Sequence, residues 1–87
     1  MLIEYSKKFI KEFKKCPDNI KKAFKIRLQI FINNEHDTIL NNHCLTGELK
    51  DYRSININGD WRAIFQEIDS GEIIYFVAIG THSQLYS

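Results

Sequence analysis

The hydrophobic pattern of this chain changes from helical to alternating at about residue 42, and this change limits the folds available to it. Before that point, apolar residues recur every three or four positions, the spacing of a helix with one buried face. After it, apolar and polar residues alternate, as they do along strands with one buried face. The pattern therefore predicts helices followed by strands.

The first half is expected to hold a helical hairpin. A short strand over residues 2–5 comes first, and Ser6 offers a hydroxyl N-cap for a helix from residue 7 to about 15. Pro17 starts a second helix that is expected to reach about residue 34, because proline suits a first helical turn. The predicted buried stripe of this second helix is Ile20, Ala23, Phe24, Leu28 and Phe31. Two helices joined this closely form an αα-hairpin.

Three strands are expected in the second half, over residues 52–58, 61–68 and 73–79, with turns at 58–60 and 69–71. The last strand is apolar on both faces and is predicted to be central in the sheet. Residues 80–87 are expected to form a short tail. The predicted fold is therefore α+β, with an N-terminal strand and an αα-hairpin packed on a mostly antiparallel sheet of about four strands.

The 87 residues are expected to form a single domain over the whole range 1–87. The longest apolar run, 73–79, is far shorter than the roughly 20 residues that cross a bilayer. The first residues lack a basic segment followed by a signal-like core. We therefore expect a cytoplasmic protein without a membrane partner.

The two cysteines, Cys16 and Cys44, are widely spaced, which in a reducing compartment predicts two free thiols. A catalytic Cys44 beside His43 is a weaker interpretation than a buried thiol, because adjacent side chains on an extended segment point apart.

The charge is distributed unevenly along the chain. Residues 1–34 contain nine Lys and Arg against three Asp and Glu, a net charge of +6, whereas residues 35–87 contain three against eight, a net charge of −5. The basic half suits an acidic partner such as nucleic acid or a negatively charged protein segment. A solvated lysine face on two helices is the simpler explanation when charge alone is considered.

Seven polar or aromatic side chains of the second half are candidates for one site on a sheet face: His43, Asn56, Asp60, Trp61, Arg62, His82 and Tyr86. A histidine titrates near neutral pH and serves as an acid or a base, although a lone histidine is more often a structural hydrogen-bonding residue. Arg62 lies on a strand where its same-face neighbour is the apolar Ile64. An arginine there should be paired, for instance with Asp60, or be held to meet an anion such as phosphate.

Four segments resemble the RelE/StbE type of toxin from type II toxin-antitoxin systems, most closely its YafQ branch. They are His43-Cys44-Leu45-Thr46-Gly47, Tyr52-Arg53-Ser54-Ile55, Asp60-Trp61-Arg62-Ala63-Ile64-Phe65 and Ile79-Gly80-Thr81-His82-Ser83-Gln84-Leu85-Tyr86. The resemblance covers nearly the whole chain. It implies a ribosome-dependent messenger-RNA endonuclease that a cognate antitoxin neutralises.

In the YafQ branch, residues matching His43, Asp60, Trp61 and His82, with an aromatic side chain where Tyr86 stands, form the active site. That branch also has a histidine four positions ahead of the aspartate, where this chain has Asn56. The RelE type has an arginine after the last strand, where this chain has Thr81-His82. The resemblance therefore implies a variant catalytic set.

Cleavage of RNA without a metal or cofactor requires a base for the ribose 2′-hydroxyl, an acid for the leaving 5′-oxygen and a cation for the phosphorane. We predict His82 as the acid, His43 or Asp60 as the base and Arg62 as the phosphate clamp. Trp61 and Tyr86 are predicted to stack on a splayed-out base, and Asn56 and Arg53 to bind RNA. Ordinary sheet packing explains Trp61 equally well.

Metal binding is not expected, because His36, His43, Cys44 and His82 have no standard zinc spacing. Two alternatives to a nuclease remain. One is a toxin of the ParE type, which inhibits gyrase by binding, and the other is an inert or decayed binding module. The pair His43 and His82 with Arg62 favours the nuclease, since an inhibitor that only binds has no chemical reason to keep them.

Overall fold

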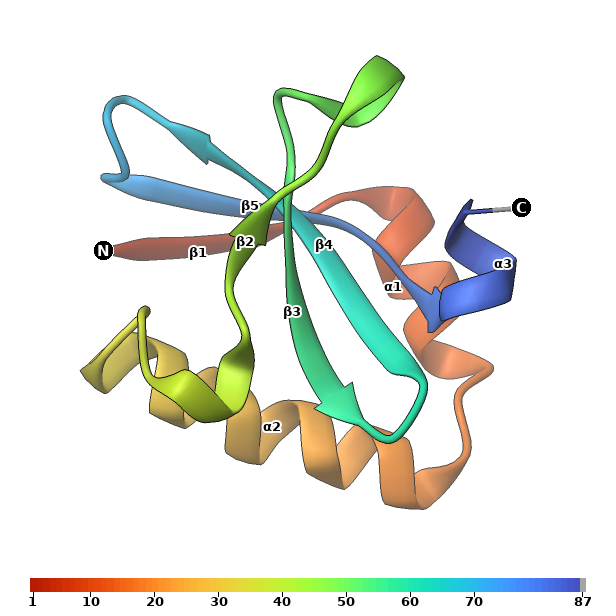
Figure 1. Cartoon of the computed structure of the whole chain (residues 1–87). Coiled ribbons are helices and arrows are strands. Elements are labelled where there is room, and N and C mark those ends of the chain that lie inside the picture. The colour runs from red at the N-terminus through yellow and green to blue at the C-terminus, as the bar shows by residue number, and fades with distance from the viewer. Residues whose placement is uncertain (87) are drawn as a thin grey trace.

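The computed structural model describes residues 1–86 and contains one five-stranded sheet in the order β1-β5-β4-β3-β2 (Figure 1). β1 is parallel to β5, and the remaining neighbours are antiparallel. The elements are β1 (Leu2–Tyr5), α1 (Lys7–Lys14), α2 (Asp18–Asn33), β2 (His43–Cys44), β3 (Arg53–Asn58), β4 (Trp61–Ile68), β5 (Ile73–Thr81) and α3 (His82–Tyr86), with short 3-10 turns η1 (Thr38–Leu40) and η2 (Gly47–Leu49). The predicted α+β fold is confirmed.

Two segments differ from the expectations. His43 and Cys44, which lie outside the predicted strands, pair with Ser54 and Arg53 and add β2 as a fifth strand. Residues 80–87 were expected to be a tail, yet β5 continues to Thr81 and is followed directly by α3. Both differences arise from pairing and packing with residues distant in the sequence, which a local hydrophobic pattern does not record.

The helical hairpin forms where the sequence predicts it. Ser6 caps α1, because its Oγ accepts a hydrogen bond from the Phe9 amide at 2.9 Å. Pro17 is the N-cap residue of α2 and has no side-chain cap to offer. In Figure 1, α2 runs across the sheet, whereas α1 lies near the C-terminal half of β5.

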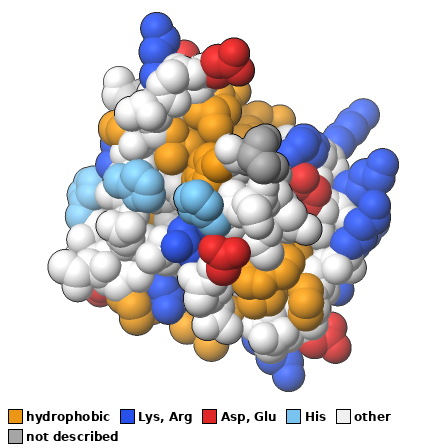
Figure 2. Space-filling model, turned by 45° about the vertical axis from the view of Figure 1, so that its right-hand side comes forward, with side chains coloured by type: hydrophobic (Ala, Val, Ile, Leu, Met, Phe, Trp, Pro, Cys, Tyr) orange, Lys and Arg blue, Asp and Glu red, His pale blue; other side chains and the backbone are white. Residues whose placement is uncertain are grey.

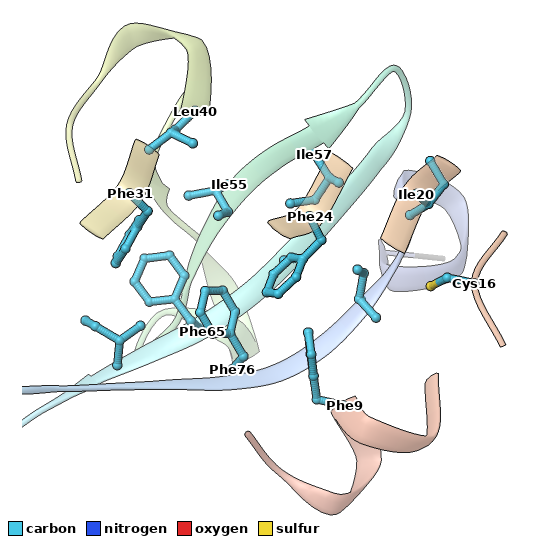
Figure 3. Packing of buried hydrophobic residues seen from close by; sticks show 13 residues of the cluster. Phe9, Cys16, Ile20, Phe24, Phe31, Leu40, Ile55, Ile57, Phe65 and Phe76 are labelled. Carbon is cyan, nitrogen blue, oxygen red and sulfur yellow. The ribbon is translucent and has the colours of Figure 1, made fainter. Parts of the chain in front are cut away.

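An aromatic cluster fills the space between the sheet and the helices (Figure 3). The ring of Phe76, which is fully buried on β5, lies 5.3–6.3 Å from the rings of Phe9, Phe24, Phe31, Phe65 and Tyr5. Burying each phenylalanine side chain contributes roughly 1.5–3 kcal/mol, so these rings are the main source of stability for a chain of this size. The predicted α2 stripe is confirmed for Ile20, Phe24 and Phe31, while Ala23 and Leu28 are partly buried.

The C-terminal half of β5 has no strand on its outer side, since β1 pairs only as far as Phe76. A bulge accompanies this change, because Ile64 pairs with Ala78 and Phe65 pairs with Phe76. Side chains from α1 satisfy part of the exposed edge: the Ile79 amide donates to Glu12 Oε1 at 3.1 Å. The edge is thereby covered by α1 rather than left open for another strand.

Among the helices within residues 1–86, none combines the length and the apolar character that a bilayer crossing requires.

Candidate functional site

The face of the sheet turned away from α2 carries two rows of paired residues. His43, Ser54, Ile64 and Ala78 form one row across β2, β3, β4 and β5. Asn56, Arg62 and Gly80 form the next row. Because residues paired directly across strands share a face, His43, Asn56 and Arg62 lie on the same surface. His43 stands two strands from β4, a separation of about 10 Å across the sheet.

The turn between β3 and β4 places Asp60 beside the end of β5. Gly59 adopts a left-handed conformation with φ of 53°, which closes the turn between Asn58 and Trp61. On the neighbouring strand, Trp61 pairs with Thr81, so the residues just outside this pair, Asp60 and His82, also meet. The His82 amide donates to the Asp60 carbonyl oxygen at 2.9 Å.

The Arg62 guanidinium is held by backbone rather than by a carboxylate. Its NH1 group donates to the carbonyl oxygens of Gly59 at 2.7 Å and of Trp61 at 3.0 Å. The expected pairing of Arg62 with Asp60 is wrong, since no ion pair between them occurs among the described residues. Carbonyl oxygens fix the guanidinium without neutralising it, which leaves its charge available to an anion.

His82 is the first residue of α3, and its imidazole is exposed. Its ring centroid lies 4.7 Å from that of Tyr86, four residues later on the same face of the helix. The aromatic contact and the amide bond to Asp60 thus restrict His82 from two sides.

The His43 imidazole is also exposed, and its tautomer follows from its surroundings. Nδ1 lies 2.7 Å from the carbonyl oxygen of Asn41. A carbonyl oxygen only accepts, so Nδ1 must carry a proton. In the neutral ring, Nε2 is then the unprotonated nitrogen and is able to accept a proton.

The remaining predicted site residues do not all join this surface. Arg53 lies on the opposite face, where it donates to Asn42 Oδ1 at 2.8 Å and to Cys44 Sγ at 2.7 Å. Trp61 is half-buried and packs against the aromatic core. Asn56 pairs with Arg62, and its buried Oδ1 has no hydrogen-bond partner among residues 1–86.

Next to these residues is a cleft of about 600 Å³. Its floor contains Ile64 and Ala78, which face away from the aromatic core, and its sides come from α1, α3 and the η2 region. Trp61 is the one predicted site residue in its lining. Figure 2 shows a histidine, a basic and an acidic side chain next to each other on this side of the molecule, beside exposed apolar surface.

The cysteines are both free, as predicted, but they differ in exposure. Cys16 is buried, and burial raises the pKa of its thiol. For Cys44 the buried-thiol interpretation is wrong, because β2 is an edge strand and leaves this side chain exposed. Within residues 1–86, no three His, Cys, Asp or Glu side chains are grouped so that they could hold a metal ion.

Sequence analysis did not single out Gln84, which contacts the segment carrying His82. The signal was present, since Thr81-His82-Ser83-Gln84 matches the capping-box spacing of a threonine and a glutamine three residues apart. It was overlooked because the segment was expected to be a tail.

The comparisons with known proteins agree on one group. Residues 1–87 match the family described as bacterial toxin of type II toxin-antitoxin system, YafQ. The crystal structure of YafQ from E. coli strain BL21(DE3) superposes with a TM-score of 0.81, at 27% identity over 98% of this chain and 97% of that one.

A structure of the E. coli DinJ-YafQ toxin-antitoxin complex gives a TM-score of 0.78, at 28% identity over 98% of this chain and 96% of that one. The YoeB/ParE toxin from Agrobacterium tumefaciens also gives a TM-score of 0.78, over 94% of this chain and 99% of that one. At 12% identity, this similarity shows a shared fold alone. No curated protein matches the sequence.

Proposed function

The chain belongs to the YafQ family of bacterial toxins from type II toxin-antitoxin systems, and on this premise we propose that it is an endoribonuclease that cleaves messenger RNA on the ribosome. The observation that carries the proposal is that His43 and Arg62 share one sheet face while His82 follows the end of the adjoining strand β5. Both imidazoles are exposed, and within residues 1–86 the Arg62 guanidinium has no carboxylate partner. Acid, base and phosphate clamp are the three groups that metal-free cleavage of RNA requires.

His43 acts as the general base in this scheme. With its Nδ1 proton donated to Asn41, Nε2 accepts the proton of the ribose 2′-hydroxyl. The 2′-oxygen then attacks the adjacent phosphorus and forms a pentavalent phosphorane. Asp60 is the other base considered, and its bond to His82 comes from the backbone carbonyl, so its carboxylate stays available for that role.

His82 acts as the general acid, and Arg62 stabilises the phosphorane. Protonated His82 donates its proton to the 5′-oxygen as the bond from phosphorus to that oxygen breaks. The products are a 2′,3′-cyclic phosphate and a free 5′-hydroxyl. The reaction needs one neutral and one protonated imidazole, which His43 and His82 supply in this scheme.

The RNA contacts are assigned to Asn56, Trp61 and Tyr86. Asn56 lies beside Arg62 on the same sheet face, and the two aromatic rings offer surfaces on which an unstacked base can lie. Arg53 is left out, because its guanidinium is engaged on the opposite face. The toxin would act as one domain. It would act in the cytoplasm, where messenger RNA and the ribosomal decoding site are found.

Programmed ribosomes incubated with the purified chain test this function, with primer extension along the messenger to locate cuts. We expect cuts in the decoding site and a loss of about 100-fold to 10,000-fold in rate for His82→Ala. His36→Ala is the matched control and should cut normally, since the ring of that exposed histidine pairs only with Glu35 among residues 1–86. Intact messenger under conditions where a known ribosome-dependent toxin cuts would refute the proposal. Growth arrest that survives His82→Ala would favour a ParE-type inhibitor.

The proposed antitoxin site is an apolar groove between α1 and α2. This groove of about 290 Å³ is lined by Tyr5, Phe9, Ile10, Phe13, Phe24 and Leu28, with Lys14 and Lys25. Ile10 is 45% exposed despite its apolar side chain. An apolar floor with two lysines, in a segment of net charge +6, suits the apolar face and acidic flanks of an amphipathic helix. We assign this occupant to the cognate antitoxin.

Reversing the groove charges tests this assignment. Lys14→Glu with Lys25→Glu should weaken antitoxin binding at least about tenfold, measured by calorimetry, because acidic flanks would then meet like charge. Lys22→Glu on α2 is the control, since Lys22 is exposed but does not line the groove. Equal losses for the double variant and the control would indicate nonspecific attraction and contradict the assignment.

A further inference from the structure

Thr81 and Gln84 form a reciprocal pair of hydrogen bonds around the start of α3. The Thr81 amide donates to Gln84 Oε1 at 2.8 Å, and the Gln84 amide donates to Thr81 Oγ1 at 3.3 Å. This is a capping box, in which two otherwise unpaired amides are satisfied at a helix N-terminus. The Gln84 side chain also covers the outer edge of β5, where Thr81 has no neighbouring strand.

α3 depends on this arrangement because it is short. A helix of five residues is not stable by itself, since helix nucleation costs more than so few hydrogen bonds return. Its first residue is His82, so any fraying at this end moves the proposed general acid directly. The His82 amide bond to Asp60 fixes the backbone at one point only, and the contact with Tyr86 requires an intact turn.

Gly80 leaves the space that Gln84 needs. A Cβ atom on Gly80 would lie 3.0 Å from Gln84 Oε1 and 3.4 Å from Gln84 Cβ and Leu85 Cδ2. The first distance is too short for a carbon and an amide oxygen to tolerate comfortably, so the amide end of Gln84 would have to move. A shift of this oxygen away from Gly80 would lengthen and weaken its bond to the Thr81 amide.

We infer that Gln84 is a positioning residue, which holds His82 in the orientation for proton transfer by closing the capping box that Gly80 makes room for. The inference rests on the proposed nuclease function and adds a residue to it. Gln84 has no acid-base chemistry of its own, so its effect on the reaction passes through His82. A displacement of about 1 Å of a catalytic group costs up to roughly 100-fold in rate.

The kinetic test compares Gln84→Ala, Gln84→Glu and Gly80→Ala. We expect Gln84→Ala to lower kcat about 10-fold to 100-fold with KM changed less than about threefold, because the bound RNA keeps its contacts. Glutamate also accepts from the Thr81 amide in a capping box, so Gln84→Glu should regain most of the lost kcat. Gly80→Ala should lower kcat by a smaller factor than Gln84→Ala, because it weakens the bond without removing it. The double variant should be no slower than Gln84→Ala alone.

Ser6→Ala is the control for a general loss of stability. It removes the cap of α1, far along the chain from His82, and should lower stability about as much without changing kcat. A Gln84→Ala variant with normal kcat would overturn the inference. So would a Gln84→Glu variant as slow as Gln84→Ala, or a Ser6→Ala variant with the same loss of kcat.

Nuclear magnetic resonance provides a readout that does not need RNA. Cross-peaks between the His82 and Tyr86 rings should be present in the parent chain, weaken in Gln84→Ala and return in Gln84→Glu. Cross-peaks unaffected by Gln84→Ala would refute the positioning. A parent chain that cuts no RNA would refute the proposed nuclease instead, so the two failures are distinguishable.

Discussion

The two faces of the sheet differ in what holds their residues in place. The face under α2 is an aromatic cluster in which each ring has several neighbours, so its geometry follows from packing. On the other side, only one or two hydrogen bonds to backbone carbonyls hold each of Arg62, His82 and His43. Substitutions on the first face should therefore change stability, and substitutions on the second face should change chemistry.

Removing the ring at the centre of the core should have the largest effect on stability. Phe76→Ala should lower the free energy of unfolding by about 3–5 kcal/mol, because a cavity replaces a fully buried ring. A chain this small has a total stability near the lower end of about 5–15 kcal/mol, so little would remain. Chemical denaturation followed by circular dichroism measures the change.

Gln66→Ala is the matched control on the opposite face, since Gln66 lies next to the core residue Phe65 along β4 but points the other way. Its cost should stay within about 0.5 kcal/mol. If both variants lost the same stability, the contrast between the two faces would be wrong.

A smaller effect is expected in the reactivity of the two thiols. Because burial raises the pKa of Cys16, less of its thiolate is present near neutral pH, and the side chain is also shielded from reagents. Cys44 is exposed on β2 and should react with iodoacetamide at least about tenfold faster. Because the pKa of Cys16 is raised, its rate of alkylation should increase at a higher pH than the rate of an ordinary thiol does.

Peptide mapping by mass spectrometry, with the fully denatured chain as the reference for equal access, gives the two rates. Similar rates in the native protein would mean that the segment between α1 and α2 opens readily. The sheet face under α2 would then be less closely packed than the contrast between the two faces requires.

The smallest effect concerns Ser54, which lies between His43 and Ile64 on the sheet face turned away from α2. Its hydroxyl is fully buried and has no hydrogen-bond partner among the described residues. Ser54→Ala removes this unsatisfied group with little change of shape and should raise stability by about 1 kcal/mol. The same denaturation experiment measures it, and a loss of stability would mean that the hydroxyl finds a partner in solution.

The sequence by itself determined the two long helices, the strands β1, β3, β4 and β5, and the residues that fill the core. These follow from hydrophobic period and from local signals such as the Ser6 cap and the turn at Gly59, which act within a few residues. It also contained the segments by which the family was recognised, around His43, Asp60 and His82.

Only the tertiary structure decided the position of each side chain in the candidate site. The parallel pairing of β1, the fifth strand at His43 and the helix after Thr81 all depend on partners distant in the chain. The same holds for Arg53, which belongs to one of the four segments that resemble the family yet lies on the other face. A local pattern fixes how a segment alternates or turns, whereas register and contact between segments are set by the packing of the whole chain.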